Sequence, residues 1–265
     1  MSATEAAASL RELFASANPS LDRLAGCVAG LARPPGRVAT IVEGVVRGLD
    51  DLAVDAPASG DGSELVDYVF GALEFTGNQA NYFDPQNSYL DRVIERRLGI
   101  PITLAVVAAE VGRRVGTTLR LIGFPGHFLL GDGDDLALFF DPFAGGRRLR
   151  IDECAQMLTD MFPGAVLEPA HTAALRPHQV TGRMLNNLKQ IHLSSGDLGS
   201  AADVALVGLA LPDPELAVRL EAIKLLEAVG RHDQAAEVLD TIAEIDTANA
   251  ERHRKAATLL RFNRN

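Results

Sequence analysis

Two side chains and one proline mark the part of this chain most suited to catalysis. His127 stands between a Pro-Gly turn and an apolar run, and Asp141 opens an Asp-Pro turn further along. A paired aspartate can orient an imidazole as the base for a cysteine at the start of a buried helix, where the helix dipole favours the thiolate. The helix in that position, however, begins Gly99-Ile100-Pro101. The spacing therefore indicates a cysteine-nucleophile site in which Pro101 replaces the nucleophile.

Other nucleophiles have weak support. Thr103 is the hydroxyl nearest to Pro101, but it would point to a different side of the helix, and threonine nucleophiles normally use a free N-terminal amine as base. Thr103 is therefore a weak nucleophile candidate. Cys27 and Cys154 lie outside the motif.

The neighbouring residues suggest a cleft, and each has an alternative structural interpretation. Asn87 and Tyr89 directly precede the motif helix, so we expect them to line the same cleft as His127. His127 could instead be a satisfied core histidine, since apolar residues surround it. Asp141 could equally serve only to start a turn.

Composition limits the function classes. The chain has 265 residues, 47% of them hydrophobic and 23% charged, with a net charge of −10, which argues against nucleic-acid binding. Two cysteines provide no disulfide framework, the N-terminus lacks a secretory pattern, and no apolar run is long enough for a membrane span. Six scattered histidines form no metal-ligand pattern, and no phosphate-binding glycine loop is present. We expect a cytoplasmic protein without metal, cofactor, nucleic-acid or membrane partner.

Apolar periodicity predicts helices followed by a short sheet. Helices are expected over residues 6–16, 21–32, 38–52 and 89–95, with a buried central helix over 101–115. Short apolar segments then predict three antiparallel strands at 118–123, 127–130 and 136–140. These elements divide the chain into an N-terminal helical region (1–60) and a compact domain (61–170).

The last third contains a repeat. Ser195–Val204 aligns with Val229–Val238 at an offset of 34 residues. The recurring glycine, at Gly196 and Gly230, suits a turn between two helices. A helical pair with this period resembles the tetratricopeptide repeat. We expect such repeats over residues 180–265, although ordinary stacked helices could show this period in two copies.

The motifs together resemble a known family. Gly99, Ala105, Arg113, Gly116, His127 and Asp141 follow the pattern of transglutaminase-like domains, which share the papain-type architecture. The chain is more specifically similar to the SirB1 family, in which such a domain precedes tetratricopeptide repeats. The segments that carry this second resemblance are 87–90, 99–104, 124–128, 141–146 and 184–189. The resemblance implies an α+β fold: a helix-rich transglutaminase-like domain with a short antiparallel sheet, followed by α-helical repeats.

The favoured function is that of a pseudoenzyme. Without the cysteine, we expect a regulatory module that binds a protein or peptide through the C-terminal repeats, with the degenerate cleft as a second contact. The alternative is a hydrolase or protease-like enzyme that uses His127 and Asp141 with water or a displaced nucleophile. A purely structural subunit is a third possibility, and the oligomeric state stays open.

Overall fold

The N-terminal helices form where the periodicity predicts them. The computed structural model describes residues 2–262, beginning with α1 (Ser2–Phe14), α2 (Leu21–Gly30) and α3 (Val38–Ala53). Helices α2 and α3 approach each other closely at two glycines. A Cβ on Gly26 would lie 2.8 Å from the Cα of Val42, so only glycine permits this contact.

Helix α6 (Pro101–Val115) is the centre of the fold, as the all-round apolar pattern predicted. It is buried from Pro101 to Ala108 and again from Glu110 to Gly112. Shorter elements precede it along the chain: α4 (Gly62–Asp67), the π-helical turn η1 (Tyr68–Ala72), the 3-10 turn η2 (Pro85–Asn87) and α5 (Leu90–Arg96). Two short parallel strands, β1 (Thr76–Gly77) and β2 (Leu98–Gly99), lead into it.

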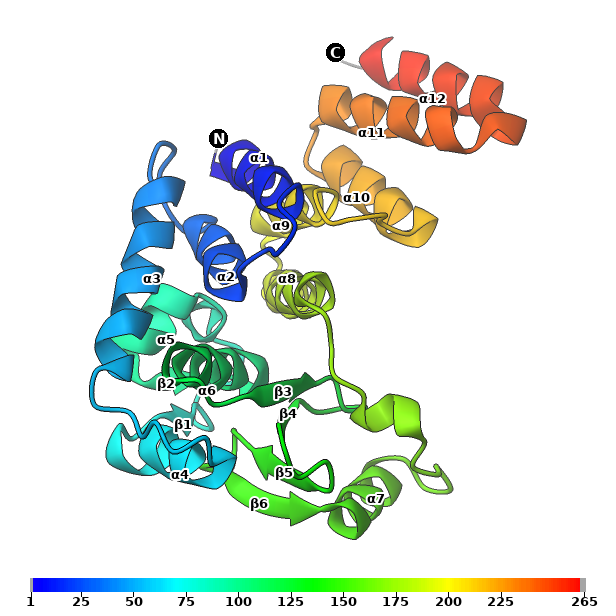
Figure 1. The fold of residues 1–265 in the computed structure, drawn as a ribbon. Coiled ribbons are helices and arrows are strands. Elements are labelled where there is room, and N and C mark those ends of the chain that lie inside the picture. Colours follow the sequence, from blue (N-terminus) through cyan, green and yellow to red (C-terminus); the bar gives the residue numbers. More distant parts are fainter. Residues whose placement is uncertain (1, 263–265) are drawn as a thin grey trace.

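An antiparallel sheet of four strands packs against α6 (Figure 1). Its order is β3 (Leu119–Ile122), β4 (Leu129–Asp132), β5 (Leu138–Asp141) and β6 (Arg147–Arg150). Alternate side chains face opposite layers: Leu130 and Phe140 join the core around α6, whereas Leu129 and Phe139 join a core with α7 (Ile151–Met161). The sequence predicted three of these strands and missed β6.

The C-terminal third is a stack of helices in chain order. After the 3-10 turn η3 (Pro169–Thr172) come α8 (Pro177–Ser194), α9 (Leu198–Gly208), α10 (Leu216–Ala228), α11 (His232–Ile245), the turn η4 (Thr247–Asn249) and α12 (Ala250–Phe262). Each helix packs on the next. Gly196 and Gly230, with φ of +76° and +73°, make the turns that follow α8 and α10.

The N-terminal helices connect the sheet domain to this stack. Helix α1 packs on α9, and α2 lies against α8 (Figure 1). One apolar core contains residues from α1 and α2 and from α8 and α9, among them Leu10, Leu24, Leu188 and Val207. The N-terminal helical region is therefore packed into the rest of the protein through this shared core. None of the helices within residues 2–262 combines the length and apolar character needed to cross a lipid bilayer.

Candidate functional site

The sheet brings His127 and Asp141 together. His127 lies in the turn before β4, so this strand starts two residues later than predicted, and Asp141 is the last residue of β5. Because β4 and β5 are antiparallel neighbours, the start of β4 and the end of β5 lie side by side at the same end of the sheet. Nε2 of His127 lies 3.1 Å from Oδ1 of Asp141.

The surroundings of Asp141 keep it ionised. Its Oδ1 accepts hydrogen bonds from the backbone amides of Phe143 (3.0 Å) and Ala144 (3.1 Å). Burial alone would raise the pKa of Asp141, but the His127 imidazole and these amides outweigh it, so the pKa lies below its ordinary value. The Nε2 atom of His127 is buried and faces this carboxylate, so Nδ1 is the ring nitrogen not directed at Asp141.

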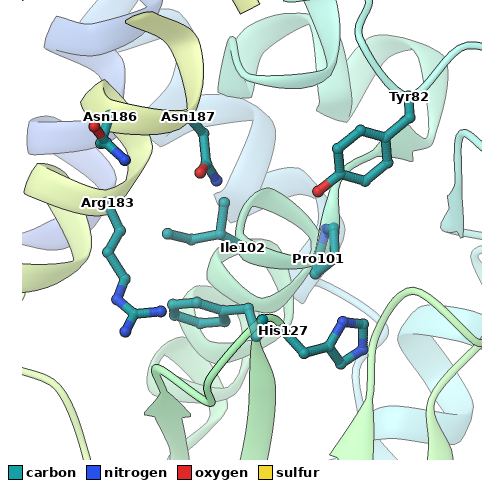
Figure 2. A pocket seen from close by; sticks show the side chains of 9 residues that line it. Tyr82, Pro101, Ile102, His127, Arg183, Asn186 and Asn187 are labelled. Carbon is teal, nitrogen blue, oxygen red and sulfur yellow. The ribbon is translucent and has the colours of Figure 1, made fainter. Parts of the chain in front are cut away.

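Pro101 faces the same space as His127. It is the first residue of α6, where its missing N–H leaves no hydrogen bond unmade. Together with Ile102, His127 and Phe128, it lines a pocket of about 470 Å³ (Figure 2). The start of the buried helix thus opens onto a cavity, in the arrangement that a nucleophile would need, but with proline at its place.

Polar side chains that the sequence analysis missed form the other walls. Arg183, Asn186 and Asn187 project from one face of α8, since residues three and four apart lie side by side on a helix. Tyr82, from the loop between β1 and η2, lies on the opposite side, and its hydroxyl points into the pocket (Figure 2). Asn186 and Asn187 fall in the 184–189 segment, which entered the sequence analysis only as part of the resemblance to the SirB1 family.

Asn87 and Tyr89, which we expected in the cleft, do not line the pocket. Asn87 is fully buried and is hydrogen-bonded to the loop between β1 and η2. Its carboxamide accepts a hydrogen bond from Asn78 Nδ2 (3.0 Å) and donates one to the carbonyl of Asn81 (2.8 Å). It thereby holds the loop that carries Tyr82. Tyr89 packs in the core shared by the N- and C-terminal helices, where burial raises its pKa to about 12.

The weak nucleophile candidate Thr103 also lies away from the pocket. Its side chain is fully buried, donates to the carbonyl of Asn87 at 2.7 Å and accepts from the amide of Ile100 at 3.1 Å. These bonds make Thr103 part of the N-terminal cap of α6, in the manner of a capping box.

Neither cysteine lies at the pocket. Cys27 is in the core shared by the terminal helices, and Cys154 is in the core between the sheet and α7. Burial raises their thiol pKa values to about 12 and about 11, which keeps both protonated and inert. Across residues 2–262, no group of three or more histidine, cysteine or acidic side chains is arranged to hold a metal ion.

Comparisons with known proteins find relatives of this part of the chain. The model of the transglutaminase-like superfamily matches residues 38–186. A UPF0162 protein of Xylella fastidiosa (strain 9a5c) is 41% identical over 143 residues, which cover 52% of this chain and 51% of that protein. F-box only protein 21 of Mus musculus is 30% identical over 143 residues, 50% of this chain and 22% of that protein. The chain spans about half the length of the UPF0162 protein it matches.

The matched segment contains most of the pocket. It runs from the first residue of α3 to Asn186 in α8, and it includes Pro101, His127 and Asp141. Since it covers more than half of the chain, the protein belongs to the transglutaminase-like superfamily.

Proposed function

We propose that this protein is a non-catalytic member of its superfamily that binds a peptide segment of a partner protein in the pocket beside Pro101. One observation carries the proposal: the pocket has the position and the His127–Asp141 pair of a nucleophilic site, yet no thiol lines it. The only hydroxyl among its lining side chains is the phenol of Tyr82. Such a site can hold an amide group without attacking it.

Exposed aromatic residues around the opening support a protein ligand. Phe83 is 66% exposed and meets Tyr82 edge to face, with ring centroids 5.4 Å apart. On the other side, Phe162 is 46% exposed and lies next to Gly126. Aromatic side chains are enriched where proteins recognise one another, because they bury a large area at low cost in entropy.

The helical stack offers a second contact. We propose that α8–α12 form tetratricopeptide-type repeats, as in the SirB1 family, and that the partner segment continues onto them. An apolar depression of about 150 Å³ between α8, α9 and α10 shares Asn186 with the main pocket. A peptide leaving the pocket along α8 would therefore reach it directly. A regulatory role in the cytoplasm, where both free cysteines stay reduced, is part of the same proposal.

A selection from a random peptide library displayed on phage with free C-termini tests this function. The full chain is immobilised, and enriched peptides are measured by fluorescence anisotropy against wild type, Asn187→Ala and Gln190→Ala. Gln190 is exposed on the same helix but does not line the pocket. We expect binding that weakens at least several-fold in Asn187→Ala and stays unchanged in Gln190→Ala. If nothing is enriched, or if both variants bind like wild type, the pocket is not a peptide site.

The retained pair favours one alternative, a hydrolase that uses water. With Nε2 directed at Asp141, Nδ1 of His127 could remove a proton from a water molecule in the pocket. A profiling assay with fluorogenic peptide and ester substrates, run with wild type and His127→Ala, separates the two functions. Turnover that disappears in His127→Ala would establish the enzyme; equal, background rates in both would leave binding as the function.

A further inference from the structure

We propose that the ligand group recognised by this pocket is a carboxylate, bound by Arg183 with help from Asn186 and Asn187. The inference rests on the proposed function and specifies its ligand. A carboxylate of a peptide partner can come from its C-terminus or from an aspartate or glutamate side chain. Both present the same two oxygen atoms to the site.

The side chains of the pocket are predominantly hydrogen-bond donors. The guanidinium of Arg183 has five N–H groups, and the carboxamides of Asn186 and Asn187 and the hydroxyl of Tyr82 can each donate as well. All four project toward one space (Figure 2). A planar ligand that accepts several hydrogen bonds satisfies this set, and a carboxylate pairs with arginine through two parallel bonds.

Within residues 2–262, Arg183 has no carboxylate partner. Its Nη2 donates to the backbone carbonyl of Gly123 at 2.9 Å, which fixes the guanidinium at the pocket and leaves most of its donors unused. Partial burial lowers the pKa of Arg183 from its ordinary value, while the residue as a whole stays exposed and open to a ligand. By contrast, Arg114 is surrounded by Asp22, Asp50 and Glu110.

The charged residues around the pocket also favour a carboxylate ligand. Among the residues that the structure describes, no aspartate or glutamate lines the pocket. The nearby carboxylate of Asp141 is already engaged by His127 and by two backbone amides. The chain as a whole carries a net charge of −10, so general electrostatic attraction would not bring an anion to it. Affinity for a carboxylate must therefore come from this local group of donors.

Four small probes test the inference and separate the two sources of the carboxylate. N-acetyl-Gly-Gly with a free C-terminus is compared with its C-terminal amide, and N-acetyl-Glu-amide is compared with N-acetyl-Gln-amide. Each is titrated into the full chain, and NMR follows the Arg183 Nε–H signal and the Asn186 and Asn187 carboxamide signals. We expect saturable shifts with at least one acid and none with its amide partner. The acid that binds more tightly identifies the source.

Two variants of Arg183 and one matched control complete the experiment. Arg183→Gln should weaken binding of the acid about tenfold or more, the order expected for a lost charge-assisted hydrogen bond. Arg183→Lys keeps the positive charge but cannot form two parallel hydrogen bonds, so its affinity for the acid should lie between those of wild type and Arg183→Gln. Arg176→Gln removes the same charge from the exposed residue that directly precedes α8, outside the pocket, and should bind like wild type. Its thermal unfolding and that of Arg183→Gln are compared to show that both fold.

The carboxylate inference fails in three cases: equal binding of acids and amides, acid binding that survives Arg183→Gln, or no shift with any probe. The proposed function is judged separately. If peptides selected on phage bind in the pocket but amidation, Glu-to-Gln exchange and Arg183→Gln leave their affinity unchanged, the peptide function stands and only the carboxylate is wrong. If no peptide binds while the acids do, the pocket is an anion site and the peptide function is wrong.

Discussion

Replacing Thr103 by valine should destabilise the protein strongly. Valine has nearly the shape of threonine, so packing is retained, but the amide of Ile100 and the carbonyl of Asn87 lose their bonds to the hydroxyl. Thr103 is fully buried, so water cannot replace these bonds. A buried backbone group left without a partner costs about 1–3 kcal/mol, so two such groups, partly offset by the more apolar valine, give a loss of about 3 kcal/mol. For a domain of this size, that loss lowers the unfolding midpoint by about 6–12 °C.

Thr181→Val is the matched control for differential scanning calorimetry. Thr181 is also fully buried, but its hydroxyl donates to the carbonyl of Pro177 (2.9 Å), one turn earlier in α8, which the helix already engages. The control should therefore stay within about 1 kcal/mol of wild type. If Thr103→Val melts at the same temperature as Thr181→Val, the reasoning about the α6 cap is refuted, and Thr103 is free for another role.

Three further predictions concern the site and its support. Pro101→Cys should be alkylated by iodoacetamide near neutral pH, because the new thiol lies at a helix start beside His127. In peptide mapping, the buried Cys27 and Cys154 should stay unmodified. Equal labelling of all three thiols would contradict an assembled site. Asp141→Asn should lower the free energy of unfolding by about 1–2 kcal/mol at pH 7. Since folding lowers the pKa of Asp141 below 3.8, this difference should be lost as the pH falls through that lowered value, and a constant difference in urea unfolding from pH 7 to pH 3 would exclude this cause. Asp22→Asn should lower the free energy of unfolding in urea by about 3 kcal/mol, because it leaves the 10%-exposed Arg114 with one fewer counterion. The control Glu43→Gln, in the exposed pair with Arg23, should lower it by at most about 1 kcal/mol.

The sequence predicts the elements whose signals are local. Helix α6 follows from a continuous apolar stretch with Pro101 at its start and Gly116 at its end, and the latter takes φ of +81°. The His127–Asp141 pair follows from two short strands joined by a turn, because antiparallel neighbours bring those positions to one edge. Both inferences depend only on residues that are close to the motif in sequence.

The elements missed are those that depend on contacts far along the chain. Strand β6 has three exposed arginines and only Leu149 buried, so its composition gives no strand pattern, and pairing with β5 forms it. The cleft residues were wrong for a similar reason. Asn87 and Tyr89 adjoin the motif in sequence, yet the wall opposite His127 comes from α8, and no periodicity tells where a distant helix will dock.

Helix α8 belongs to the part of the chain that must be inherited or transplanted as one unit. On one side it supplies Arg183, Asn186 and Asn187 to the pocket, and on the other it places Leu185 and Leu188 in the core shared with α1 and α2. A recombination event in the loop before Pro177 would separate the sheet from these three pocket side chains and expose that core to water. Because α1 also packs on α9, we expect the functional module in evolution and in protein engineering to extend past the sheet and through α9, with the freely exchangeable part of the chain beginning only beyond that helix.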